Sequence, residues 1–161
     1  MEIRGFKAFN HHLLTRYGVK LEVGMTYYTD KQIKYGNNGN GFHFCKNLAD
    51  TLRFFDGMNE KVDICEVIGS EEIIEREDDY NGYYEMYVCK KLHIIKELSR
   101  DEILKIVLGN SEEQIIKLIK GYKLSPKECE TILRTRNNNI NISDTIDYFQ
   151  FKKLDTYQKK I

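Results

Sequence analysis

The sequence has 161 residues, of which 41% are hydrophobic and 12% aromatic, so it can fill the core of one ordinary domain and is not a wholly disordered chain. Its 25 basic and 25 acidic residues give a formal net charge of zero, which disfavours recruitment by bulk charge to nucleic acid or to a membrane, although not binding by a local patch. No apolar run is long enough to span a bilayer, and the first residues lack the apolar region of a signal peptide, so we expect a cytoplasmic protein without a membrane partner.

Residues 1–98 contain apolar and aromatic runs that are separated by glycine and asparagine, the pattern of β-strands. The strand candidates are residues 3–9, 19–23, 41–45, 62–68 and 83–98, the last in one or two pieces. Between the third and the fourth run, a helix is expected to begin after Asn47 and to end at Gly57. Its apolar face would consist of Leu48, Thr51, Leu52 and Phe55.

After residue 98, helix signals dominate. Three serines each precede a Glu or Gln by three positions, the pattern of a capping box; the pairs are Ser99 with Glu102, Ser111 with Gln114, and Ser125 with Glu128. Gly109 and Gly121 suit the ends of the first two helices, and Pro126 suits the first position of the third. The expected helices therefore span residues 100–108, 112–120 and 126–134.

Three consecutive asparagines, 137–139, interrupt the helical pattern. Beyond them, an apolar stripe predicts a last helix capped by Ser143, with Ile146, Phe149, Leu154 and Tyr157 on one face. A strand through residues 148–151 is the alternative.

Together these elements predict an α+β fold with a bent or split antiparallel sheet of five to six strands, one packed helix, and a C-terminal group of three to four short helices. The change of pattern near Leu98 predicts two parts. They are an α+β domain at residues 1–98 and a helical annex at residues 99–161.

Four cysteines lie at least twenty residues apart and form no C-x-x-C pair; they are Cys45, Cys65, Cys89 and Cys129. This spacing favours neither a zinc site nor a disulfide framework, and we expect reduced thiols in the core. His11 and His12 have no acidic or cysteine partner at ligand spacing, so no metal site is predicted.

The segment 39–45 is a short strand flanked by glycines, and it leads directly into the expected helix. Alternation places Phe42 and Phe44 on one face of this strand, and His43 and Cys45 on the other. His43 could stack on a flat ligand or donate a hydrogen bond to it. Alternatively, it could satisfy a hydrogen bond beneath the Gly/Asn loop.

This arrangement resembles the second motif of ADP-ribosyltransferases of the poly-ADP-ribose polymerase and diphtheria-toxin type. Residues 62–69 resemble the strand that follows in that family, residues 84–88 resemble the strand with its catalytic glutamate, and residues 3–5 resemble its first-strand motif for NAD ribose. The likeness covers about residues 1–98. In amino-acid sequence, residues 41–45 more closely resemble a domain of unknown function in phage and bacterial proteins. That resemblance implies no activity.

The resemblance to the transferases implies NAD as cofactor, bound by Arg4, Gly5, Gly41, Phe42 and His43. It implies that His43 stacks on nicotinamide. It also implies that Glu85 is catalytic, holding the nicotinamide ribose and stabilising an oxocarbenium-like transition state.

Three positions depart from the family pattern. His43 replaces a tyrosine, Arg4 stands where the polymerase branch has histidine, and a one-residue shift of register would turn Glu85 to the other face of the sheet. Arg4 could equally be a surface charge, and Glu85 a partner of Lys90 or Lys91.

Two functions follow. One is a small phage or bacterial ADP-ribosyltransferase-like protein that acts on a host macromolecule with NAD, and the excess of lysine over arginine fits an AT-rich genome of that kind. The other is a non-catalytic binding protein, such as a phage-encoded inhibitor of a host defence system of the anti-CRISPR type. The expected partner is a host protein or nucleoprotein, met in the host cytoplasm. The acidic run 71–79 is expected to be a solvated surface, or to face a basic partner.

Overall fold

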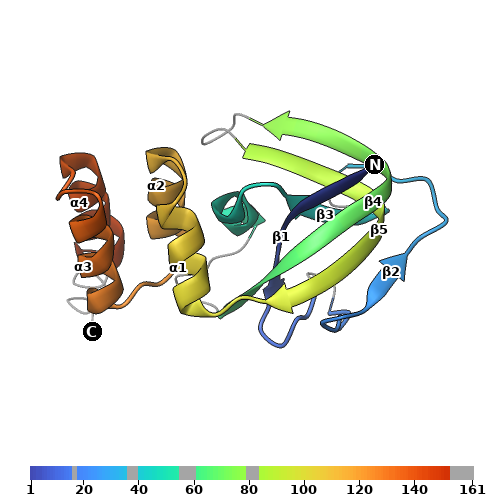
Figure 1. Ribbon diagram of the computed structural model, residues 1–161, viewed down its shortest axis with the longest axis horizontal. Coiled ribbons are helices and arrows are strands. Elements are labelled where there is room, and N and C mark those ends of the chain that lie inside the picture. The colour runs from blue at the N-terminus through green and yellow to red at the C-terminus, as the bar shows by residue number, and fades with distance from the viewer. Residues whose placement is uncertain (16–17, 36–39, 55–60, 79–83, 153–161) are drawn as a thin grey trace.

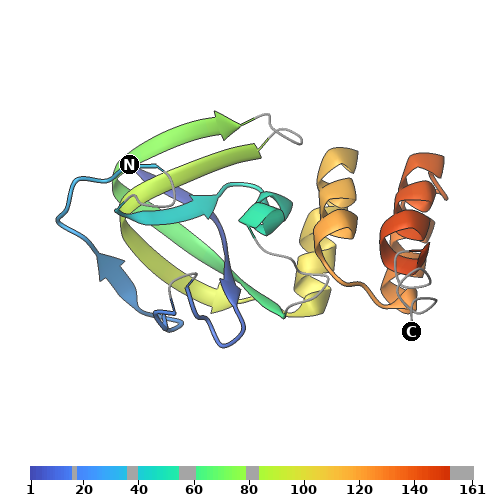
Figure 2. The same ribbon diagram turned by 180° about the vertical axis from the view of Figure 1, so that it is seen from behind.

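The computed structural model describes residues 1–15, 18–35, 40–54, 61–78 and 84–152. Its strands are β1 (Glu2–Asn10), β2 (Thr26–Tyr28), β3 (Phe42–Cys45), β4 (Val62–Asp78) and β5 (Tyr84–Glu97). Its helices are the 3₁₀-helix η1 (Leu48–Phe54), α1 (Arg100–Leu108), α2 (Glu112–Gly121), α3 (Pro126–Thr135), α4 (Ile140–Ile146) and the π-helix η2 (Asp147–Lys152). The predicted α+β class is confirmed. The sheet forms one end of the molecule and α1–α4 the other, with η1 between them (Figures 1 and 2).

The sheet is antiparallel and closes on itself. Its order is β2-β5-β3-β1-β4, and β4 also pairs with β5, so β1, β3, β5 and β4 form a circuit. Both long strands bend at mid-length (Figure 1). At this bend, Glu71 and Glu72 adopt left-handed φ angles of 59° and 52°, and the register shifts between Ser70 and Ile73.

The bend divides the β4–β5 hairpin into two arms. In the proximal arm, residues 62–70 of β4 pair with β1. In the distal arm, residues 86–89 of β5 pair with β3 on one side and with β4 on the other. Each arm pairs with a different short strand, so the bend allows one hairpin to pair with both β1 and β3.

The seam between β1 and β3 is short. It contains one bridge, between Phe6 and Cys45. A side chain supplements it, because the Lys7 ammonium donates a hydrogen bond to the His43 carbonyl at 2.6 Å. Lys7 faces the interior of the sheet, on the same side of β1 as the buried Phe9.

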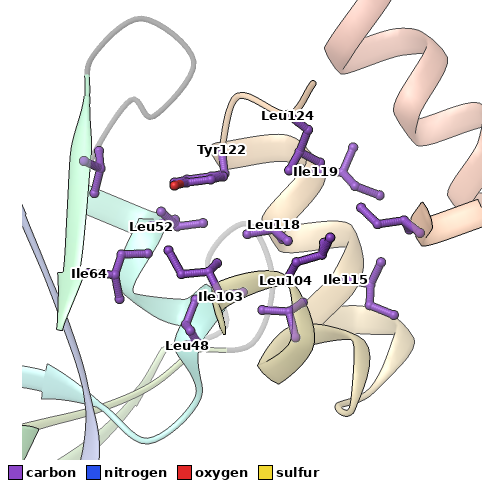
Figure 3. Close-up of a cluster of buried hydrophobic side chains, with 14 of the residues drawn as sticks. Leu48, Leu52, Ile64, Ile103, Leu104, Ile115, Leu118, Ile119, Tyr122 and Leu124 are labelled. Atoms are coloured by element: carbon purple, nitrogen blue, oxygen red, sulfur yellow. The ribbon is translucent and has the colours of Figure 1, made fainter. Parts of the chain in front are cut away.

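Two hydrophobic clusters fill the molecule. The inner cluster, enclosed by the bent sheet, consists of Phe9, Leu21, Phe44, Cys65, Val67, Tyr87, Cys89, Leu92 and Ile94. The larger cluster joins Leu48 and Leu52 of η1 and Ile64 of β4 to side chains of α1 and α2, such as Ile103 and Leu118 (Figure 3). The core therefore continues across the predicted boundary near Leu98.

Most expected elements are present, with some changes of detail. The helix α1 has the predicted bounds, while α2 and α3 are each one residue longer. The expected helix after Asn47 is η1; Phe55 and Gly57 lie outside the described residues. The expected strand 19–23 is wrong, since Lys20 forms only an isolated bridge to Leu14, and the sequence reading missed β2.

The strand alternative for residues 148–151 is also wrong, because η2 continues α4 there. The cap of α4 is Asn139, whose side chain accepts a hydrogen bond from the Ile142 N–H, and not Ser143. Gln150 docks η2, since its side chain donates to the Ile119 and Tyr122 carbonyls and accepts from the Leu124 N–H. Such long-range contacts outweigh the local β-propensity of the aromatic residues. Leu154 and Tyr157 lie outside the described residues.

All four cysteines are buried and free, as expected for reduced core thiols. Burial raises the pKa of the Cys65 thiol to about 12 and those of Cys89 and Cys129 to about 11, so these thiols are poor nucleophiles at neutral pH. None of the helices in the described part of the chain is long and apolar enough to cross a membrane.

Lys7 gives the fold a testable pH dependence. Burial lowers the pKa of its ammonium from 10.5 to about 8, so the unfolded chain holds this proton more tightly than the folded one. The contribution of Lys7 to stability should therefore rise with pH between about 8 and 10.5, by about 1 kcal/mol from pH 7 to pH 9. We expect Lys7→Met to abolish this rise in urea unfolding. The comparison is made from pH 7 to pH 9, because the Lys7 charge also influences the Cys45 and Cys89 thiols, which ionise at higher pH. An identical pH dependence of the two proteins in this window would contradict the assignment.

Candidate interaction surface

The register of β3 and β5 places two of the predicted site residues on opposite faces of the sheet. His43 lies opposite Val88, and Phe44 lies opposite Tyr87. Directly opposed residues share a face, and neighbours along a strand alternate, so His43 is on the face of Val88. Glu85 is on the face of Tyr87, whose hydroxyl donates a hydrogen bond to the Glu85 carboxylate at 2.5 Å. The structure does not bring His43 and Glu85 together.

Arg4 and Gly5 lie on β1. The exposed guanidinium of Arg4 forms an ion pair with Glu66, with 3.5 Å between Nε and Oε1. Gly5 lies where β1 approaches β3, and a Cβ at this position would be 2.3 Å from the Cys45 carbonyl oxygen. Gly5 is therefore required by strand packing, independently of any cofactor.

Gly41 and Phe42 are also held by packing. Gly41 has a φ of 109°, and a Cβ there would be 2.8 Å from a methyl carbon of Val88. Phe42 lies opposite Cys89 and packs on the inner cluster. The next residue, His43, places its ring centroid 5.5 Å from that of Tyr35.

The face that His43 occupies is rich in tyrosine and arginine. We call it the arginine–tyrosine face and define it by Tyr35, His43, Arg53, Arg76 and Tyr84. These side chains come from the β2–β3 connection, β3, η1, β4 and β5, respectively. The shared face follows from the register as well, because Arg76 lies opposite Met86, two positions from Val88 on β5.

Two cation–π pairs meet over a buried methionine on this face. The guanidinium carbon of Arg76 lies 4.7 Å from the Tyr35 ring centroid, and that of Arg53 lies 5.2 Å from the Tyr84 ring centroid. The Met86 sulfur accepts a hydrogen bond from the Tyr35 hydroxyl at 3.0 Å and lies 4.0 Å from a guanidinium nitrogen of Arg53. Met86 thus places the two pairs side by side.

A buried carboxylate anchors one end of this face. Asp50 of η1 is 1% exposed, and one of its oxygens accepts hydrogen bonds from Lys117 at 2.9 Å and Gln114 at 2.8 Å, both from α2. The other oxygen accepts from the backbone N–H of Glu85 at 3.2 Å. Asp50 therefore ties η1, α2 and the start of β5 to one another.

Lys117 connects this network to the arginine–tyrosine face. Its side chain is 9% exposed, and its ammonium lies 4.2 Å from the Tyr84 ring centroid. Tyr84 therefore meets two cations, Arg53 and Lys117. Glu113, one turn earlier on α2, lies 3.5 Å from the ammonium at the margin of the face.

The sequence reading missed most of this surface. Gln114 was interpreted as the second half of a capping box, but only Ser111 plays its part, and the Gln114 side chain instead binds Asp50 and the Ala49 N–H. Arg76 lies within the acidic run and is exposed, which agrees with the expected solvated surface, but its position over Tyr35 is not apparent from the sequence. A cation in alternation with Glu75 and Glu77 was the available signal that this run is a strand with two different faces.

A cavity of about 480 Å³ lies away from this surface, at the ends of the C-terminal helices. Its lining residues are Leu108, Glu112, Thr135, Arg136, Asn137, Asn139 and Ile142. The Arg136 guanidinium already donates to the carbonyls of Leu108 and Asn110. Within the described ranges, no cluster of three or more His, Cys, Asp or Glu side chains could hold a metal ion.

These features define an α+β protein whose bent, closed sheet is joined to its helices by a shared hydrophobic core and by a buried carboxylate network. Residues 3–106, from β1 into α1, match the model of the family described as domain of unknown function (DUF7666), and the chain belongs to this family. No curated protein and no solved structure matches the chain significantly.

The Asp50 network yields a stability prediction. Lys117→Met leaves a buried carboxylate without its cation and should lower the free energy of unfolding by about 3 to 5 kcal/mol, measured by urea denaturation. The double variant Asp50→Asn, Lys117→Met removes both charges and should recover more than half of this loss.

Arg134→Gln serves as the matched control, because it breaks only an exposed pair with Glu130 and should leave the unfolding midpoint unchanged. A Lys117→Met variant as stable as the parent protein would contradict the network.

Proposed function

We propose that this protein is a non-catalytic binding module that contacts a macromolecular partner through the arginine–tyrosine face. One observation supports the proposal above the others: the pairs Arg76–Tyr35 and Arg53–Tyr84 lie next to each other over Met86. Tyrosine, arginine and methionine are the residues in which the centres of binding interfaces are enriched.

The stacking also lowers the cost of binding. A guanidinium that already rests on an aromatic ring has lost part of its rotamer freedom before the partner arrives. Tyr35 is fixed by its hydrogen bond to Met86, and Tyr84 by the cations on its ring. Such preorganisation favours affinity because less entropy is lost on association.

The opposite placement of His43 and Glu85 supports binding over ADP-ribosyl transfer. In the transferase resemblance, the residue that stacks on nicotinamide and the catalytic glutamate act on the same cofactor. Here the sheet separates them, and Glu85 is engaged by Tyr87. An inhibitor that blocks a host defence protein by direct contact would be one member of the proposed class.

Site-specific photo-crosslinking tests the proposal. A benzoylphenylalanine in place of Tyr35, in protein produced in its native host cells, should give a discrete crosslinked product upon irradiation. The same substitution at Tyr148, an exposed tyrosine of η2, is the matched control and should give none. Equal products from both positions, or none from Tyr35, would contradict the assigned face.

NAD provides the second test. We expect the melting temperature to stay constant in millimolar NAD, because a ligand raises it only by binding the folded state. Glu85→Gln should likewise leave the Tyr35 crosslink unchanged. A rise in melting temperature together with transfer of label from NAD to a macromolecule, lost in Glu85→Gln, would establish the transferase function instead.

A further inference from the structure

The partner of the arginine–tyrosine face can be inferred from its chemistry, given the function proposed above. We propose that this face binds a short stretch of single-stranded nucleic acid, with bases stacking on the ring–guanidinium pairs and phosphates lying against the arginines. The juxtaposition of Arg76–Tyr35 with Arg53–Tyr84 over Met86 is the basis of this inference.

The rings and guanidinium planes offer flat surfaces. Bases that are not paired stack on tyrosine and on arginine planes, and such stacking tolerates any sequence because every base has a π-face. Two ring–cation pairs from four different elements converge on this face, and His43 lies beside the first pair. The two ring–guanidinium pairs and His43 thus provide stacking positions for neighbouring bases of one strand.

The strand register puts Arg76 on the face opposite to Glu75 and Glu85. Arg76 lies on the side of Met86, whereas Glu75 lies opposite Tyr87, on the side of Glu85. On the arginine side, the carboxylate of Asp50 is buried and bound to Lys117. Glu113 lies 3.5 Å from the same ammonium at the margin, and Asp78 occupies the register position opposite Tyr84. The attraction for phosphate therefore comes locally from Arg53 and Arg76, which reconciles a nucleic-acid site with a net charge of zero.

Single strands fit this face better than duplexes or acidic proteins. A duplex hides its base planes in its own stack, so they cannot stack on the rings and guanidinium groups of this face. A carboxylate from a protein partner needs only the guanidinium edges and leaves the ring faces uncovered. A few phosphate contacts imply modest affinity with weak salt dependence.

Fluorescence anisotropy with a labelled 12-nucleotide oligo(dT) and an oligo(U) of the same length tests the inference on the full chain. Binding should weaken with salt with a log–log slope of about −1.4, for about two phosphates on a single strand. Arg76→Gln and Tyr35→Leu should each weaken binding about tenfold, with circular dichroism confirming the fold. Arg134→Gln should not change it.

Any one of three results would overturn the inference. They are no binding of the oligonucleotides at 50 mM salt, equally tight binding of a 12-base-pair duplex or of polyglutamate, and an oligonucleotide affinity that Arg76→Gln does not change. A protein crosslinked to position 35 without oligonucleotide binding would overturn the inference and leave the proposed function standing. Loss of both the crosslink and the oligonucleotide binding would overturn both.

Discussion

The structure depends on one buried carboxylate. Asp50 is almost inaccessible to water, and a carboxylate in such a place is tolerated only if its oxygens are fully paired. Lys117, Gln114 and the backbone N–H of Glu85 provide that pairing, and they come from α2 and β5. Because these three partners must meet at one point, the position of η1, the docking of α2 and the start of the distal arm are determined together.

The geometry of the arginine–tyrosine face depends on the same Asp50 network. The element η1 places Arg53, β5 places Tyr84, and Lys117 lies against the same tyrosine ring. The family match ends within α1, so Asp50 lies inside the matched region whereas its partners on α2 lie beyond it. The helix α2 therefore completes the network that holds the candidate surface in place.

Local chemistry was enough to predict the class of the fold and the helix α1, where Ser99 and Gly109 mark the two ends. It was not enough for the surface. The face on which Glu85 lies depends on strand register, and the closed circuit depends on a bend where two glutamates adopt left-handed φ angles that neither side chain predicts. Asp50 and Lys117 are 67 residues apart, and no local pattern signals a pairing over that distance.

Hydrogen exchange in Lys117→Met, followed amide by amide, tests the central role of Asp50 most directly. The amide of Glu85 donates to Asp50, and that of Ala49 donates to Gln114. If the network holds η1 and the distal arm, exchange at these two amides should accelerate by a larger factor than that of Val67, in the proximal arm, which accelerates only as far as the loss of global stability requires. Unchanged exchange at Glu85 and Ala49, or equal acceleration at all three amides, would contradict this account.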